Sequence, residues 1–140
     1  MYAPLFVGTG CLHSFGTGGL LDSGGVARIA ADTLVLQGSG MTNSSCLYFQ
    51  GTTQVNGGLG SHFGDGLRCA GGTVIRLGTK TNVGGASQYP EGGDPSVSVR
   101  GNVTVPGSVR TYQVWYRNSA AFCTPDGFNL TNGLAVTWEM

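Results

Sequence analysis

The chain has 140 residues, of which 26 are glycine and only 10% are charged, and its formal net charge is zero. This length suits one domain with a real core, and the charge balance provides no basic stripe for binding nucleic-acid phosphates. Glycine is costly inside helices, and Val, Thr, Tyr and Phe stand in short runs between glycine clusters, so the composition favours an all-β domain. No apolar run approaches the ~20 residues needed to cross a bilayer, so no membrane span is expected.

The first apolar segment, residues 3–8, is separated from the rest of the chain by a Gly- and Ser-rich stretch. Two interpretations are open. The segment pairs as an edge strand of its own domain, or it leaves and completes the sheet of a neighbouring subunit. In the second case Leu5 and Val7 on one face, or Phe6 on the other, insert into the neighbour's groove.

A regular strand pattern begins at Val26, so we divide the chain into residues 1–25, an apolar strand plus linker, and residues 26–140, a β-sandwich domain. Strands are predicted over residues 33–37, 46–50, 73–78, 96–100, 110–118 and 134–139. With turn signals about every ten residues, the pattern predicts about seven to nine short strands in a two-sheet antiparallel sandwich, Greek-key and immunoglobulin-like in architecture. A β-barrel is the alternative.

The densest aromatic cluster lies in the strand predicted over residues 110–118. Because side chains alternate along a strand, Tyr112, Val114 and Tyr116 share the face expected to be core, and Trp115 lies on the opposite, mixed face. Trp115 is expected to be covered by the long polar loop 82–94. Otherwise it is partly exposed, and it stacks on a sugar or contacts another subunit.

Three other strands have clear inward faces. Leu34 and Leu36 share one face, Val97 and Val99 another, and Trp138 is expected in the core on the face it shares with Leu134 and Val136.

Reactive motifs are not apparent in the sequence. Asp65 beside His62 lacks the further carboxylates that a calcium site uses, and an Asx turn explains it better. No Ser, His and Asp order and no pair of carboxylates fits a hydrolase. We therefore expect neither an enzyme nor a cofactor nor a bound metal.

The four cysteines are widely spaced and contain no C-x-x-C pair, which favours disulfides over a zinc site and an oxidising, extracellular setting. They are Cys11, Cys46, Cys69 and Cys123. Three N-x-Ser/Thr sequons are candidate glycosylation sites wherever the machinery exists. They begin at Asn43, Asn102 and Asn129.

Several short motifs occur in a fixed order between Ala31 and Trp138. They are Gly38–Met41, Leu47–Gly51, Phe63–Cys69, Arg76–Lys80, Ser98–Gly101, Tyr112–Asn118, Phe122–Pro125 and Phe128–Gly133. With these motifs the chain resembles a Gly-rich β-sandwich module found near the C-termini of large secreted proteins of environmental, planctomycete-like bacteria. The module has no known activity, so the resemblance implies an extracellular or cell-surface location and an architecture, but no chemistry.

Departures from the module's pattern bear on the cysteines. Such modules usually follow a Cys- and Gly-rich segment, of which Cys11 resembles the last remnant, and Cys46 stands where a small residue is more usual. The resemblance therefore implies that Cys11 pairs with Cys46 and that Cys69 pairs with Cys123.

Together these features predict a non-enzymatic extracellular structural protein that forms a filament or surface layer. Copies of the chain would be its partners, joined by donation of residues 3–8 to a neighbouring subunit. The alternative is an adhesion or carbohydrate-binding module of a larger secreted protein, which would bind polysaccharide through Trp115 and residues 82–94.

Overall fold

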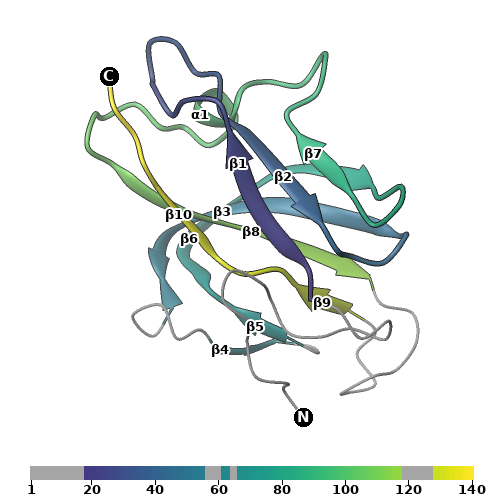
Figure 1. Cartoon of the computed structure of the whole chain (residues 1–140). Coiled ribbons are helices and arrows are strands. Elements are labelled where there is room, and N and C mark those ends of the chain that lie inside the picture. The colour runs from purple at the N-terminus through teal and green to yellow at the C-terminus, as the bar shows by residue number, and fades with distance from the viewer. Residues whose placement is uncertain (1–17, 56–60, 64–65, 118–127) are drawn as a thin grey trace.

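The computed structural model describes residues 18–55, 61–63, 66–117 and 128–140, which form mostly β-strands (Figure 1). A five-stranded antiparallel sheet contains β3 (Ser45–Gln54), β6 (Ala70–Thr81), β8 (Val109–Arg117), β9 (Phe128–Leu130) and β10 (Leu134–Thr137). A three-stranded antiparallel sheet contains β1 (Leu20–Gly24), β2 (Val35–Ser39) and β7 (Ser87–Tyr89). The other elements are the hairpin of β4 (Ser61–Phe63) and β5 (Gly66–Arg68), and the one-turn helix α1 (Val97–Arg100).

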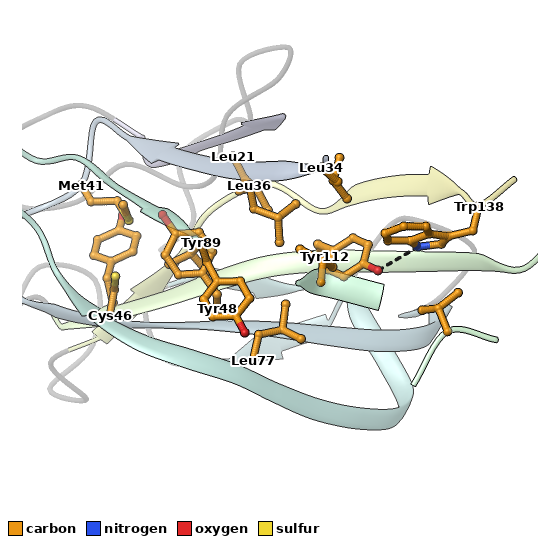
Figure 2. Packing of buried hydrophobic residues seen from close by; sticks show 14 residues of the cluster. Leu21, Leu34, Leu36, Met41, Cys46, Tyr48, Leu77, Tyr89, Tyr112 and Trp138 are labelled. Carbon is orange, nitrogen blue, oxygen red and sulfur yellow. Dashed lines mark hydrogen bonds between the residues drawn. The ribbon is translucent and has the colours of Figure 1, made fainter. Parts of the chain in front are cut away.

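The two larger sheets lie face to face and enclose one hydrophobic core (Figures 1 and 2). The strand orders are β1-β2-β7 in one sheet and β10-β8-β3-β6 in the other, with β9 also paired to β8. Strand β8 returns beside β3 rather than beside β6, as in a Greek key. The predicted two-sheet sandwich is therefore confirmed, and the sheets do not close into the alternative barrel.

Strand β8 has the orientation that its alternating sequence predicts. Tyr112, Val114 and Tyr116 are fully buried in the core, and β8 pairs with β3 on one side and with β9 and β10 on the other. Large aromatic side chains bury much apolar area, and this strand supplies two of the largest fully buried residues. Trp138 is also fully buried, as predicted.

Three buried polar side chains of the core are linked by hydrogen bonds. The indole Nε1 of Trp138 donates to the hydroxyl of Tyr112 at 3.0 Å (Figure 2). That hydroxyl donates to Oε1 of Gln50 at 2.8 Å. Gln50 in turn donates from Nε2 to the carbonyl of Gly101 at 2.9 Å. This chain of bonds offsets the desolvation cost of three polar side chains and joins β3, β8, α1 and the C-terminal segment.

The strand predicted over residues 96–100 is wrong, because these residues contain helix α1. Val97 is buried but Val99 is 68% exposed, so the two valines do not share an inward face. The amide of Ser98 donates to Oδ2 of Asp32 at 2.8 Å, and the amide of Gly101 donates to the carbonyl of Val97 at 2.8 Å. Five residues are too few to separate a period of two from one turn of helix, and the helical turn here is held by its own backbone bond and by the tertiary bond to Asp32.

Two segments that were expected to be irregular contain strands of the smaller sheet. Residues 20–24, assigned to the linker, form β1, whose Leu21 enters the core. Asn132 holds this strand: its Oδ1 accepts from the amide of Leu21 at 2.7 Å, and its Nδ2 donates to the carbonyl of Leu21 at 3.1 Å. The expected loop 82–94 likewise contains β7, which pairs with β2.

The C-terminal segment joins the two sheets beyond β10. The amide of Ile29 donates to the carbonyl of Glu139 at 2.8 Å, and the amide of Glu139 donates to the carbonyl of Ala27 at 3.0 Å. Trp138, on the same segment, fills the core between the sheets. No helix among the described residues has the length and apolar character needed to cross a membrane.

Some predictions fall outside the described residues and stay predictions. They concern the segment 3–8 with Leu5, Phe6 and Val7, together with Cys11, Cys123 and Asp65.

Candidate functional site

The outer face of the five-stranded sheet carries a row of apolar side chains around Trp115. In the register of the sheet, Trp115 lies opposite Leu47 of β3 and Leu130 of β9. The next row pairs Gln113 with Phe49. Because these positions alternate with the buried row of β8, they face away from the main core and form a second apolar surface.

A small second cluster fixes Trp115 on this face. Phe49, Ala70 and Leu130 are buried together, and Trp115 packs against them. The rings of Trp115 and Phe128 have centroids 5.4 Å apart and planes tilted by 51°, an arrangement favourable for aromatic pairs. The indole is therefore held in place by its neighbours while remaining partly exposed.

The expectation that the loop 82–94 covers Trp115 is wrong. Tyr89 of this segment is buried in the main core, and β7 belongs to the opposite sheet. Trp115 points to the other side of the five-stranded sheet, where its described neighbours come from β3, β6 and β9. The partly exposed alternative for Trp115 matches its observed environment.

A groove crosses this face over β6, β3 and β8. It has a volume of about 340 Å³ and is lined by Leu47, Phe49, Arg68, Val74, Arg76 and Trp115. An adjoining hollow of about 400 Å³ shares Leu47, Arg76 and Trp115 and extends to Arg117. Both volumes fall in the range of ligand pockets, which are usually apolar with a few placed polar groups.

Arginines provide the charge of this groove. The guanidinium of Arg117 lies 5.7 Å from the centre of the Trp115 ring, within the range of a cation–π contact. Arg76 is exposed on β6, and Arg68 donates from Nε to the carbonyl of Ala70 at 3.0 Å. Four of the chain's seven Lys and Arg residues, Arg100 among them, thus border the groove and its adjoining hollow, and none of the described lining residues is acidic.

Hydrogen bonds fix the walls of the groove. Gln113 is fully buried, and its Oε1 accepts from the amides of Cys69 at 2.8 Å and Ala70 at 3.3 Å, while its Nε2 donates to the carbonyl of Thr131 at 2.6 Å. These bonds attach the segment that follows Arg68 to strand β8. On the other side, Ser44 donates from its hydroxyl to the carbonyl of Arg117 at 2.8 Å.

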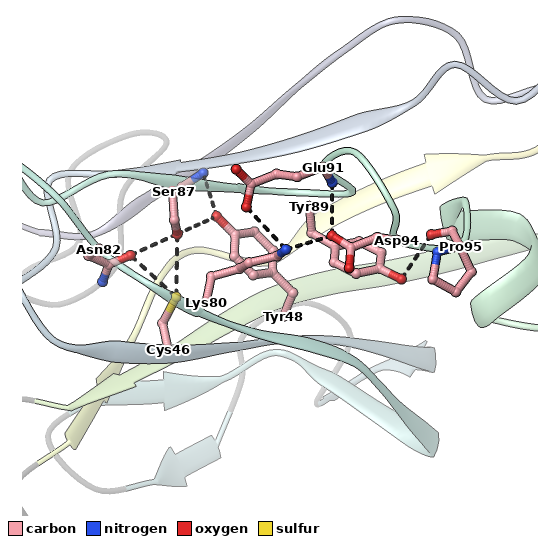
Figure 3. Close-up of polar contacts among 10 residues, drawn as sticks. Cys46, Tyr48, Lys80, Asn82, Ser87, Tyr89, Glu91, Asp94 and Pro95 are labelled. Atoms are coloured by element: carbon pink, nitrogen blue, oxygen red, sulfur yellow. Dashed lines mark hydrogen bonds and ion pairs between the residues drawn. The ribbon is translucent and has the colours of Figure 1, made fainter.

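A polar network of a different kind surrounds Cys46 between the sheets (Figure 3). The Cys46 thiol donates to Oδ1 of Asn82 at 3.3 Å, and the Ser87 hydroxyl donates to the same oxygen at 2.7 Å. The Tyr48 hydroxyl lies 2.9 Å from that of Ser87 and accepts from the amide of Gly38 at 3.1 Å. Burial raises the pKa of the Cys46 thiol and raises the pKa of Tyr48 to about 12, so both groups stay neutral at pH 7. The network thus joins β3 to β7 of the opposite sheet through neutral, mostly buried groups.

The expected disulfides are not tested by the described residues. Cys46 carries a free thiol in this network, and its proposed partner, Cys11, lies outside the described part of the chain. Cys69 lies beside the β8–β10 side of the sheet, where a Cβ added at Gly133 would come within 2.6 Å of its Cβ. Its proposed partner, Cys123, is likewise outside, so both pairings stay predictions.

The three sequons differ in accessibility. Asn129 is fully buried, and its Oδ1 accepts from the amide of Leu130 at 2.7 Å, so it is closed to modification in the folded chain. Asn102 is exposed and has a φ of 53° in a loop. Asn43 is exposed, but its Oδ1 accepts from the amide of Gly85 at 2.6 Å. Asn102 is therefore the most accessible of the three.

An ion-pair cluster lies apart from the groove at the C-terminal end of β6. The Nζ of Lys80 lies 2.5 Å from Oδ2 of Asp94 and 3.1 Å from Oε1 of Glu91 (Figure 3). The hydrogen bond from Lys80 holds the pKa of Asp94 below its ordinary value, and the bond to Asp94 raises the pKa of Lys80. Both pKa shifts favour the charged forms of Lys80 and Asp94 at neutral pH. The cluster therefore suits a structural ion pair and not proton transfer.

No group of three His, Cys, Asp or Glu side chains with metal-binding geometry occurs among the described residues. No protein-family model matches the chain, and no curated protein or solved structure is significantly similar to it. The module resemblance therefore stays an expectation, and function has to be inferred from the surfaces of the molecule.

Sequence reasoning found Trp115 but missed the residues that make the groove around it. The available signal was the run Cys46-Leu47-Tyr48-Phe49, which is apolar at consecutive positions of one strand. Such a run indicates a strand with apolar neighbours on both faces, one of them the core and the other this outer surface.

Proposed function

We propose that this protein is a non-enzymatic extracellular structural subunit that assembles with copies of itself by strand addition to the edge of β6. The observation that carries the proposal is the position of β6. It is the longest of the described strands at 12 residues, and on its far side no described strand pairs with it. A long edge strand presents backbone amides and carbonyls that can pair with another chain.

The free section of the β6 edge matches the length of residues 3–8, the proposed donor strand. Lys80 with its two carboxylate partners occupies the C-terminal end of β6, which leaves the section 73–78 as the acceptor. Six residues in extended conformation span roughly 20 Å, so residues 3–8 would cover this section. The formal net charge of zero removes the repulsion that would otherwise oppose association of identical subunits.

Removal of the donor tests the proposal directly. We expect the full chain to form polymers visible by negative-stain electron microscopy, and the chain lacking residues 1–10 to stay monomeric by light scattering. A synthetic peptide of residues 1–10 should bind the truncated chain and slow amide hydrogen exchange in β6, whereas a scrambled peptide should not. Equal polymerisation of both chains, or protection at β1 or β7 instead of β6, would refute strand addition at this edge.

The alternative function, adhesion or carbohydrate binding, would use a different part of the molecule. It requires the face of the five-stranded sheet around Trp115 and not its β6 edge. The two functions therefore use different surfaces of the molecule, and experiments can distinguish them.

A further inference from the structure

The groove around Trp115 has an apolar floor and a cationic rim. Leu47, Phe49 and the indole of Trp115 lie along the floor, and Arg76 and Arg117 stand beside it. We propose that this groove binds a segment of an acidic polysaccharide, a saccharide that carries carboxylate or sulfate groups. The proposal is independent of assembly through the β6 edge.

Charge complementarity indicates an anionic ligand. Every ion pair among the described residues involves Lys80, so neither Arg76 nor Arg117 is paired with a described carboxylate. Several described acidic side chains are engaged elsewhere: Asp94 and Glu91 bind Lys80, and Asp32 accepts from the amides of Leu34 and Ser98. Guanidinium groups match carboxylate and sulfate oxygens through paired N–H donors, which makes an anion the fitting occupant.

The backbone beneath the groove favours a saccharide over a peptide. Strand β3 is paired with β6 on one side and with β8 on the other, so its amides and carbonyls are used within the sheet. A peptide ligand usually gains affinity from main-chain hydrogen bonds at a sheet edge, and the middle of a sheet face offers none. Recognition here depends on side chains alone, and an indole with flanking guanidinium groups suits sugar rings that carry charges.

The recognition groups are largely positioned before any ligand binds. Trp115 is packed against Phe49 and Phe128, and the backbone of Arg117 is held by Ser44. Preorganisation of this kind lowers the entropy cost of binding. Only the exposed side chains of Arg76 and Arg117 have to become ordered on an incoming anion.

The test measures binding of defined oligosaccharides by calorimetry and by tryptophan fluorescence. The probes are an oligogalacturonide and a sulfated heparin-derived oligosaccharide, with cellohexaose as the neutral control and hexaglutamate as the acidic peptide control. Trp138 is fully buried, so a ligand-dependent change in emission reports on Trp115. We expect at least one acidic oligosaccharide to bind more tightly than both controls, with an affinity that falls as salt is added.

Substitutions assign the binding to the groove. Arg76→Gln, Arg117→Gln and Trp115→Leu should each weaken binding about tenfold, which corresponds to loss of one charge-assisted or stacking contact. Arg28→Gln, which removes an exposed charge that does not line the groove, is the matched control and should leave affinity unchanged. Thermal denaturation checks that each variant is folded.

Four results would overturn the proposal. The first is binding of cellohexaose as tight as that of the acidic saccharides, and the second is tighter binding of hexaglutamate. The third is no detectable binding of either acidic saccharide. The fourth is a loss of affinity in Arg28→Gln as large as that in the groove variants. Because all these measurements use binding as the readout, failure of polymer formation does not affect them.

Discussion

Replacement of Tyr112 by Phe removes one hydroxyl that serves two buried partners. The hydroxyl accepts from Nε1 of Trp138 at 3.0 Å and donates to Oε1 of Gln50 at 2.8 Å. All three side chains are fully buried, so water does not replace the lost bonds. A buried polar group left without a partner costs roughly 1–3 kcal/mol, and two such groups are created. We therefore expect Tyr112→Phe to lower the free energy of unfolding by about 2–6 kcal/mol.

Tyr89→Phe is the matched control. Tyr89 is also buried, but its hydroxyl donates one hydrogen bond, to the carbonyl of Pro95 at 2.9 Å, so its loss should cost about 1 kcal/mol. Both variants are to be compared with the parent chain by equilibrium urea denaturation followed through tryptophan fluorescence, with a common slope required for the comparison. A cost for Tyr112→Phe equal to or below that for Tyr89→Phe would refute the reasoning, because the orphaned Trp138 and Gln50 groups would then carry no penalty.

Three further predictions follow from single contacts. A Cβ on Gly51 would lie 2.5 Å from the backbone of the neighbouring strand, so Gly51→Ala should lower the free energy of unfolding by about 1–3 kcal/mol, measured by denaturation. Gly92 has open space around it, so the control Gly92→Ala should change the free energy of unfolding by less than about 0.5 kcal/mol. The pKa of Asp94 is lowered in the folded chain, so its stabilising effect is present above its ordinary value of 3.8 and is lost as the pH falls through the folded-state pKa. Below about pH 4, the thermal midpoint of Asp94→Asn should therefore change less with pH than that of the parent chain. The same pH dependence in both chains would contradict a stabilising Lys80–Asp94 ion pair. Peptide mapping without reductant should recover a Cys69–Cys123 link, whose loss would cost about 4 kcal/mol, and free thiols at both positions would exclude it.

The sandwich was predictable because its main strands alternate strictly. Tyr112, Val114 and Tyr116 are inward at every second position, and the same rule placed Trp138 in the core. The rule failed at Val97 and Val99, where the segment is as short as one helical turn and hydrogen bonds to distant residues decide the backbone. It also failed at β1, where the glycines and serines typical of loops are tolerated because Asn132 and β2 supply the hydrogen bonds.

The candidate groove was less predictable than the fold. The sequence singled out Trp115 as an aromatic residue on the mixed face of its strand, but the identity of its neighbours depends on strand order and register. Register places Leu47 beside Trp115, and the position of β6 next to β3 brings Arg76 to the same face. Neither pairing is encoded in local periodicity, because residues 47, 76 and 115 are far apart in the chain.

The bonds between the two ends of the domain have a consequence for folding kinetics. Asn132 holds Leu21 across a separation of 111 residues, and the segment around Glu139 pairs with residues 27–29. Contacts this distant require large loops to close before they stabilise anything, and domains dominated by them fold in milliseconds to seconds. We expect β1 to dock after the central β3–β6–β8 pairing has formed, so substitutions at Asn132 should speed unfolding and leave the folding rate almost unchanged.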